Sequence, residues 1–427
     1  MDCYSFRNTI FHVEDMNIKE ISETVGTPVY VYSRTQLKKQ FLNFRDDLKS
    51  RLKVPFRICY ALKANSNLAV ISTLAEMGCG ADIVSEGELL RALRSHVPSK
   101  NIVFSGVGKT SGEITAALAN NIACFNVESQ SELETINTIA IEMGVKAPVA
   151  LRLNPDIDAK THEKISTGKK DTKFGIFISD YLECFRYAAS LTGIHLIGVD
   201  AHIGSQITCI DPFNKAFVRI SEVIRTLKSE GYDLSYLNLG GGLGIAYLNG
   251  EGFIPCQDYA ALVQEIFGGF DCFITFEPGR RLVADCGIMI SKVLHIKSHD
   301  DKKFLIIDAG MNDFLRPAMY AADHNIMLAQ QSNIDTPKEI YDIVGPVCET
   351  SDTFAKNYAL PSCCQGDLLI FNSVGAYSAV MASEYNTRPL IPEVMVQNNT
   401  FAIIRNRPSY DEILDRDIIP QWADYES

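Results

Sequence analysis

The sequence contains no C-x-x-C pair, although twelve cysteines are scattered along its 427 residues. Neither a zinc ribbon nor a thioredoxin-like redox site is therefore indicated, and we expect no metal site. The adjacent Cys363 and Cys364 are poorly placed to form a disulfide with each other, and most of the other cysteines stand in apolar runs as small hydrophobic residues. This usage favours a reducing compartment, so we expect a cytoplasmic protein.

The sequence also has no apolar run near the ~18 residues of a membrane span. Its first residues, MDCYSFRNTI, lack the basic and apolar regions of a signal peptide. Positive charge is not in excess, because 40 Lys and Arg stand against 52 Asp and Glu, for a net charge of −12. We therefore expect neither a membrane nor a nucleic acid as the main partner.

What is present is the composition of an ordinary globular protein, with 46% hydrophobic and 22% charged residues. A length of 427 residues exceeds the usual size of one compact core. The length therefore predicts two domains.

Between residues 56 and 279 a short apolar run, a turn and a helical pattern alternate along the chain. The eight runs are FRICYAL (56–62), ADIVS (81–85), NIVFSG (101–106), ACFNV (123–127), PVALRLN (148–154), LIGVDAHIG (196–204), LSYLNLGGG (234–242) and CFITFEPG (272–279). Eight parallel strands that each lead into a helix can close into a (β/α)8 barrel, with functional residues on the loops at the C-terminal strand ends. An open doubly wound sheet is the alternative. Eight units in a row favour the barrel, which we place at residues 34–285.

Three of the intervening helices should begin with a capping box. In this motif the N-cap side chain and a glutamate three residues later each accept a hydrogen bond from the other's backbone N–H group. The predicted pairs are Ser85 with Glu88, Thr110 with Glu113, and Ser129 with Glu132.

After about residue 286 the pattern changes to β-rich runs separated by polar turns. These runs are IMISKVLHI (288–296), KFLIIDAG (303–310), DLLIFN (367–372) and TFAIIRN (400–406). They predict an antiparallel β domain. The strand-like VYVYS (29–33) precedes the barrel and belongs with this second domain in our interpretation, which gives it residues 1–33 and 286–427.

Lys63 in YALKAN follows the first apolar run, where a barrel directs side chains toward the active-site mouth. Burial there can lower the pKa of the amine and make it a nucleophile for Schiff-base chemistry. The alternative is a solvated lysine at a strand end. Taken by itself, Lys63 fits that alternative at least as well.

The last two runs end in glycines that suit a phosphate. Gly240, Gly241 and Gly242 close the seventh run, and their backbone N–H groups are open to close approach. Gly279 in EPGR closes the eighth run. Loops after strands seven and eight are the usual phosphate site of such barrels.

Three further side chains at strand ends could bind an aromatic phosphate. Glu277 could pair with a protonated ring nitrogen, or alternatively with Arg280 or Arg281. His202 in HIGSQ could stack on a flat ring, although a lone histidine is more often structural. Ser205 could offer its hydroxyl to the phosphate.

The motifs YALKAN, AHIGSQ, LGGGLG and EPGR, in this order, resemble the fold-type III pyridoxal-phosphate (PLP) decarboxylases, which act on diaminopimelate, ornithine or arginine. The resemblance covers nearly the whole chain. LRLNPDIDAKTHEKISTGKKDTKFGI (151–176), RPAMY (316–320), GPVCET (345–350) and GAYSAVMASEYNTRP (375–389) are similar to the diaminopimelate branch of that family. The resemblance implies PLP-dependent decarboxylation of meso-2,6-diaminopimelate to L-lysine and CO2, the last step of lysine biosynthesis.

The resemblance also implies roles for individual residues. Lys63 would hold PLP as a Schiff base, His202 would stack on its ring, and Glu277 would pair with the ring nitrogen. The phosphate would be held by Ser205, Gly241, Gly242, Pro278 and Gly279 of EPGR, the Arg280 backbone, and Tyr377. The carboxylate that is not lost would be bound by Arg280, Arg316, Tyr320 and Tyr377. Glu349 would bind the amino group beside that carboxylate, and Cys348 would protonate the carbanion.

In that family Cys348 and Glu349 would reach the site from a partner subunit, which implies a homodimer with shared active sites. Two departures from the family pattern stand beside the expected site, Glu86 in place of glycine and Val374 in place of threonine. Neither replaces a chemical group, so they bear on local packing more than on activity.

Alternative functions remain within and outside the family. A decarboxylase of ornithine, arginine or carboxynorspermidine is disfavoured because two arginines, Arg280 and Arg316, suit a distal carboxylate that a simple amine lacks. An inactive regulator of the same fold is disfavoured by the presence of Lys63 and Cys348. An alanine-racemase-like barrel enzyme fits the CET and LRLNPD motifs poorly.

Overall fold

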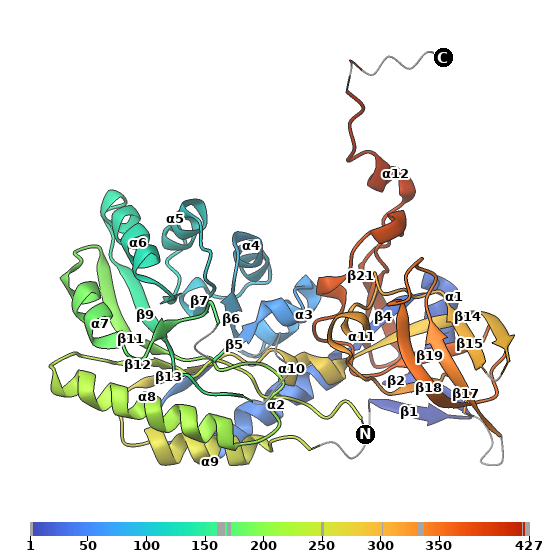
Figure 1. Ribbon diagram of the computed structural model, residues 1–427, viewed down its shortest axis with the longest axis horizontal. Helices are drawn as coiled ribbons and strands as arrows, with labels where there is room; N and C mark the ends of the chain where they lie inside the picture. The colour runs from blue at the N-terminus through green and yellow to red at the C-terminus, as the bar shows by residue number, and fades with distance from the viewer. Residues whose placement is uncertain are drawn as a thin grey trace. The chain divides into compact units, whose positions relative to one another are not determined.

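The computed structural model describes residues 3–159, 167–168, 172–248, 252–300, 302–331, 337–420 and 422 (Figure 1). The chain forms two compact units. One comprises Arg34–Cys286 and Gly375–Val380, and we call it the barrel unit. The other comprises Met1–Ser33, Gly287–Val374 and Met381–Ser427, and we call it the β unit.

The barrel unit is a closed ring of eight parallel strands. Its strands are β5 (Phe56–Ala61), β6 (Gly80–Ile83), β7 (Ile102–Phe104), β8 (Cys124–Val127), β9 (Ala147–Asn154), β11 (Ile194–Asp200), β12 (Tyr236–Asn238) and β13 (Phe273–Phe276). Each pairs with its neighbour in this order, and β13 returns to β5. The pairing of β8 with β9 completes the ring, so the barrel is confirmed over the open sheet. A two-residue strand, β10 (Ile176–Phe177), adds to β9.

Helices follow the strands, and Figure 1 shows them on the outside of the ring. They are α2 (Arg34–Arg51), α3 (Leu68–Ala75), α4 (Glu86–Arg94), α5 (Ser111–Ala119), α6 (Gln130–Glu142), α7 (Tyr181–Ser190), α8 (Asp211–Ser229), α9 (Cys256–Phe267) and the short α10 (Arg280–Val283). A 3-10 turn, η1 (Leu62–Ala64), follows β5 and carries Lys63. Because parallel strands under helices are buried on both faces, they read as the continuous apolar runs seen in the sequence.

Of the three predicted capping boxes, only that of Thr110 and Glu113 is reciprocal. Ser85 and Ser129 do cap α4 and α6 with their side chains. Their glutamate partners instead accept from the residue before the cap, since Val84 N donates to Glu88 and Glu128 N donates to Glu132, each at 2.8 Å. For Ser85 and Ser129 the prediction was therefore correct for the bond to the serine side chain and wrong for the bond to the glutamate.

The β unit is built around the long strand β14 (Gly287–His299). It pairs antiparallel with β4 (Val29–Ser33), β15 (Lys302–Ile307) and β19 (Leu368–Phe371). β4 also pairs in parallel with β20 (Glu393–Gln397), which places VYVYS inside this sheet. The remaining strands are β16 (Ile326–Leu328), β17 (Lys338–Val344), β18 (Thr353–Pro361) and β21 (Thr400–Arg405). Most pairings are antiparallel, as expected, and each predicted run contains a strand.

The described residues of the β unit also form three short strands and three α-helices. Strands β1 (Tyr4–Arg7), β2 (Ile10–Val13) and β3 (Met16–Asn17) form a small antiparallel sheet. The helices are α1 (Ile18–Val25), α11 (Arg316–Tyr320) and α12 (Tyr410–Leu414). An apolar core beneath them includes Val29, Val31, Ile288, Ile290 and Val394. Within the described ranges, no helix is both long and apolar enough to cross a membrane.

Candidate active site

Lys63 lies at the C-terminal end of β5, where its ammonium group donates to Asp82 Oδ2 at 2.8 Å. Burial lowers the pKa of Lys63, but the attraction of Asp82, Tyr377 and Glu277 outweighs burial and leaves the pKa above its ordinary value. The direction is opposite to the one expected from burial alone. The reason is Asp82 at the end of β6, a fully buried carboxylate to which sequence reasoning gave no role.

Asp82 belongs to a group of buried carboxylates at the ends of barrel strands that includes Glu128, Asp200 and Glu277. Burial raises the pKa of Asp200 to about 7, and the charges of Glu128 and Asp82 add to this while Arg152 opposes it. One oxygen of Asp82 and one of Asp200 accept no hydrogen bond within the described residues. The strand ends therefore concentrate negative charge that is only partly compensated.

Glu277 directly follows β13, and amide groups are its hydrogen-bonding partners. Its Oε1 accepts from Asn126 Nδ2 at 3.2 Å and from Asn238 Nδ2 at 2.5 Å. Burial raises the pKa of Glu277 well above its ordinary value, and the charges of Asp82 and Asp200 raise it further. A protonated ring nitrogen beside this carboxylate would reverse that effect, so the residues present fit a pyridine ring.

The alternative partners of Glu277 considered from the sequence were Arg280 and Arg281. In the described part of the chain neither arginine contacts it. Arg280 donates to Tyr247 and Ser205, and Arg281 donates to the Gly244 carbonyl.

His202 lies after β11 and accepts a hydrogen bond at Nδ1 from the Gly241 N–H, at 3.2 Å. Burial lowers the pKa of His202 well below its ordinary value, and the positive charges of Arg152 and Lys63 lower it further. The imidazole is therefore neutral, with its proton on Nε2. A flat neutral ring suits stacking on another aromatic ring.

The glycines after β12 allow a close backbone approach to neighbouring loops. A Cβ on Gly241 would stand 2.2 Å from the Glu277 carbonyl oxygen, and one on Gly242, which has a φ of +100°, would stand 2.7 Å from the Gly204 carbonyl oxygen. The Gly241 N–H is directed to His202, so in this arrangement it orients the imidazole. Gly279, which follows Pro278 and precedes α10, lies beside the Tyr377 hydroxyl, 3.4 Å from where its Cβ would be.

Arg280 connects these loops. Its guanidinium donates to the Tyr247 hydroxyl and, at 3.1 Å, to Ser205 Oγ. It also lies 4.7 Å above the centre of the Tyr377 ring. Tyr377 is held in the barrel unit by its backbone N–H, which donates to the Ala64 carbonyl at 2.7 Å, next to Lys63. The structure thus brings together Lys63, His202, Ser205, Glu277, Gly279, Arg280 and Tyr377 within the barrel unit.

The remaining predicted residues lie in the β unit. Arg316 and Tyr320 are the first and last residues of α11, with the guanidinium carbon 5.9 Å from the Tyr320 ring centre. Cys348 and Glu349 are exposed in the loop between β17 and β18. Hydrogen bonds from Tyr385 and Ser351 to Glu349 lower the pKa of its carboxyl group.

Sequence reasoning missed polar residues that end the barrel strands. Asp82, Asn126, Asp200 and Asn238 are each buried. A signal was present, because each is a polar residue inside a largely apolar run, in ADIVS, ACFNV, LIGVD and LSYLN. Within a barrel such positions converge at the active-site end.

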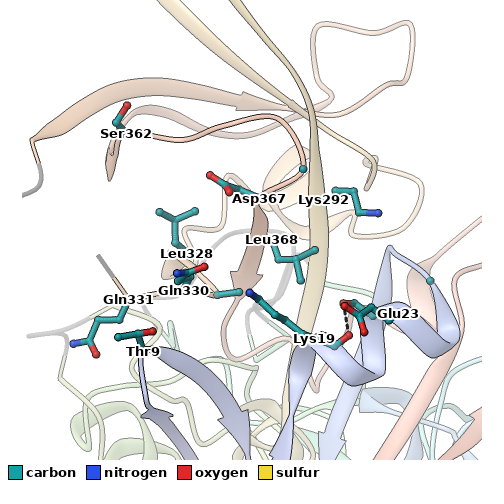
Figure 2. A pocket seen from close by; sticks show the side chains of 14 residues that line it. Thr9, Lys19, Glu23, Lys292, Leu328, Gln330, Gln331, Ser362, Asp367 and Leu368 are labelled. Atoms are coloured by element: carbon teal, nitrogen blue, oxygen red, sulfur yellow. Dashed lines mark hydrogen bonds between the residues drawn. The ribbon is translucent and has the colours of Figure 1, made fainter. Parts of the chain in front are cut away.

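A hollow of about 860 Å³ in the β unit contains none of the predicted residues. Figure 2 shows Lys19 extending from α1 toward its middle. Its lining includes positive charges on Lys19 and Lys292 and negative charges on Glu23 and Asp367. This mixture selects no particular ligand.

The fold and these strand-end residues define a barrel enzyme that works with a bound pyridoxal group. A family model of the pyridoxal-dependent decarboxylases, covering their pyridoxal binding domain, matches residues 34–284. The diaminopimelate decarboxylase of Zymomonas mobilis is 42% identical over 98% of this chain and 99% of its own length. That of Vibrio cholerae is 45% identical over 92% and 93% of the two chains.

Solved structures agree with this assignment. The chain is similar to the Helicobacter pylori diaminopimelate decarboxylase complexed with L-lysine, with a TM-score of 0.89 and 43% identity over 94% of this chain and 99% of the other. For the M. jannaschii enzyme in co-complex with L-lysine, the TM-score is 0.93, with 39% identity over 98% of both chains. The chain belongs to the diaminopimelate decarboxylase family of the pyridoxal-dependent decarboxylases.

The ion pair of Lys63 with Asp82 generates a test. Asp82→Asn removes the negative charge nearest the amine, so the pKa of Lys63 should fall by roughly 1–3 units. More of the amine is then neutral at a given pH. PLP added to cofactor-stripped protein should therefore attach to Lys63 at lower pH than in wild type, as measured by absorbance and by mapping the peptide labelled after borohydride reduction.

Asp200→Asn is the matched control, because Asp200 is equally buried but does not pair with Lys63. Its effect on the pH dependence should be smaller. An unchanged pH dependence in Asp82→Asn, or a label on another lysine, would contradict this account of Lys63.

Proposed function

We propose that the protein decarboxylates meso-2,6-diaminopimelate to L-lysine and CO2, with PLP attached at Lys63. The observation that carries the proposal is the match along nearly the whole chain to diaminopimelate decarboxylases, two of which have been solved in complex with L-lysine. The bound PLP supplies an electron sink for the electron pair that the departing carboxylate leaves behind.

The barrel residues position that chemistry. Lys63 provides the amine for attachment, and Asp82 holds the ammonium proton at its Oδ2. Glu277, held by Asn126 and Asn238, would pair with the ring nitrogen and favour its protonated form. The neutral His202 ring would stack on the cofactor. Ser205, Gly279 and Tyr377 would bind its phosphate, together with the backbone N–H groups of the neighbouring loops.

The β-unit residues bind the end of the substrate that is not changed. Arg316 and Tyr320 would hold the distal carboxylate, Arg280 is a further candidate for it, and Glu349 would accept from the adjacent amino group. Cys348 delivers the proton that replaces CO2. Decarboxylation of ornithine is the second candidate, but ornithine has no carboxylate at its distal end to pair with an arginine.

A substrate comparison tests the proposed function. Purified holoenzyme should release CO2 from meso-diaminopimelate with a kcat/KM roughly a hundredfold or more above that for ornithine or free arginine. The reason is that these two substrates have no distal carboxylate to pair with the side chains of Arg280 and Arg316. The measurement is CO2 release from each substrate separately. A preference for ornithine would support the second candidate and reject the first.

Arg316 provides the next test. Arg316→Ala should weaken binding of diaminopimelate by roughly 2–5 kcal/mol, the usual cost of removing one partner from a buried charge pair. The cofactor absorbance should not change. Arg416→Ala is the control, since Arg416 pairs with Glu384 on the surface of the same unit. Loss of PLP with unchanged substrate affinity in Arg316→Ala would contradict the role of Arg316.

We also propose a cytoplasmic homodimer in which each active site is completed by the partner subunit. All twelve cysteines are free thiols, which suits a reducing compartment. Cys348 and Glu349 are exposed on their own chain, as groups that serve another subunit would be. A two-fold dimer would then build two equivalent shared sites.

Subunit mixing tests the shared site. Lys63→Ala and Cys348→Ala should each have little activity alone. Under conditions of subunit exchange, about half of the dimers are mixed and one of their two sites is intact, so activity should recover to roughly a quarter of wild type. If exchange is proven but activity only averages the two parents, each site lies within one chain.

A further inference from the structure

We propose that His324 is a positioning residue whose neutral imidazole orients the Arg316 guanidinium toward the distal carboxylate of the substrate. The proposal rests on the proposed function, because it concerns how that substrate is bound. Arg316 Nε donates to His324 Nε2 at 3.2 Å, and both side chains are buried. No motif in the sequence pointed to His324.

Two hydrogen bonds of the ring indicate its protonation. His324 Nδ1 lies 2.9 Å from the Asn372 carbonyl oxygen, which can only accept, so Nδ1 carries a proton. Nε2 faces an arginine N–H, which can only donate, so Nε2 is without a proton. The ring is therefore neutral, and its tautomer is set by a main-chain carbonyl on one side and by Arg316 on the other.

The surroundings hold the ring in place. His324 is 4% exposed and packs edge-on against the Phe314 ring, with centroids 4.7 Å apart and an angle of 80° between the planes. The Asn372 backbone is itself tied down, because its N–H donates to the Asn325 carbonyl at 3.0 Å. A ring fixed at this depth can fix the guanidinium that donates to it.

A neutral acceptor suits this task better than a carboxylate. A carboxylate at this position would orient Nε but would also neutralise the guanidinium and compete with the substrate. His324 orients the group and leaves its charge in place. Because Nε–H is directed to His324, the substrate carboxylate would be bound by the N–H groups on Nη1 and Nη2, which can act together as a two-pronged donor.

Two amide substitutions separate the bond to Arg316 from the bond to the main chain. His324→Gln places an amide oxygen near the position of Nε2, so it can still accept from Arg316. His324→Asn is shorter and reaches only the position of Nδ1, so it can bond the Asn372 carbonyl but not Arg316. Both are neutral amides in the same buried place.

The readout compares ligands with and without the carboxylate. L-lysine and cadaverine, which is lysine without its carboxylate, are titrated calorimetrically into each holoenzyme. We expect His324→Asn to weaken L-lysine binding roughly 10- to 100-fold and to leave cadaverine binding unchanged. His324→Gln should bind L-lysine within a few fold of wild type. In assays with diaminopimelate, KM should rise in His324→Asn while kcat and the cofactor absorbance stay the same.

Three outcomes would overturn the proposal: unchanged L-lysine binding in His324→Asn, equal weakening of both ligands, or a Gln variant as weak as the Asn variant. Equal weakening would mean that His324 only supports the local structure. If His324→Asn does not fold, His324→Ala takes its place with the same selective loss expected. A wild-type enzyme that does not decarboxylate diaminopimelate would instead reject the proposed function, whatever the variants do.

Discussion

Negative charge buried at the strand ends is the constraint on which the barrel site depends. Asp82, Asp200 and Glu277 are almost inaccessible to water, and a buried carboxylate stays charged only beside a positive group. The ammonium group of Lys63 supplies the positive charge beside Asp82. Beside Asp200 lies the guanidinium of Arg152, whose Nε is 3.8 Å from Asp200 Oδ2. Glu277 has only amide donors within the described residues. A protonated pyridine ring would place a positive charge beside Glu277. The buried carboxylate, which is unfavourable in the protein without the cofactor, would therefore favour cofactor binding.

The eight barrel strands could be predicted from the sequence because each is buried on both faces and reads as an apolar run. The site could be predicted less completely. Lys63, Glu277 and the glycines stand in recognisable motifs, whereas the partner of Lys63 comes from β6 and those of Glu277 come from β8 and β12. β6 is the neighbour of β5 and β12 is the neighbour of β13, whereas β8 lies elsewhere in the ring. Which of these side chains meet depends on how the closed barrel brings its strand ends together, and the individual motifs do not show that.

The capping boxes also show that side-chain partners are harder to predict from the sequence than the elements that carry them. Glu132 was expected to accept from the N–H of its own N-cap residue, but Lys109, buried nearby, donates to its Oε1 at 2.6 Å. Its other oxygen then reaches Glu128 N. Local sequence predicts which residue caps a helix, while a partner 23 positions away decides where the glutamate points.

The loop that carries Cys348 has to satisfy two opposing demands. If Cys348 protonates the carbanion, as we propose, its thiol must be accessible. Accessibility, however, removes the packing that would fix the position of the thiol. Asp352, which is 3% exposed, holds the base of this loop. Its two carboxylate oxygens accept hydrogen bonds from Met311 N and Val347 N, each at 2.6 Å. Gly345 has to be glycine for the same reason, since a Cβ there would lie 2.4 Å from Asp352 Oδ2. These contacts hold the base of the loop in place while Cys348 remains exposed.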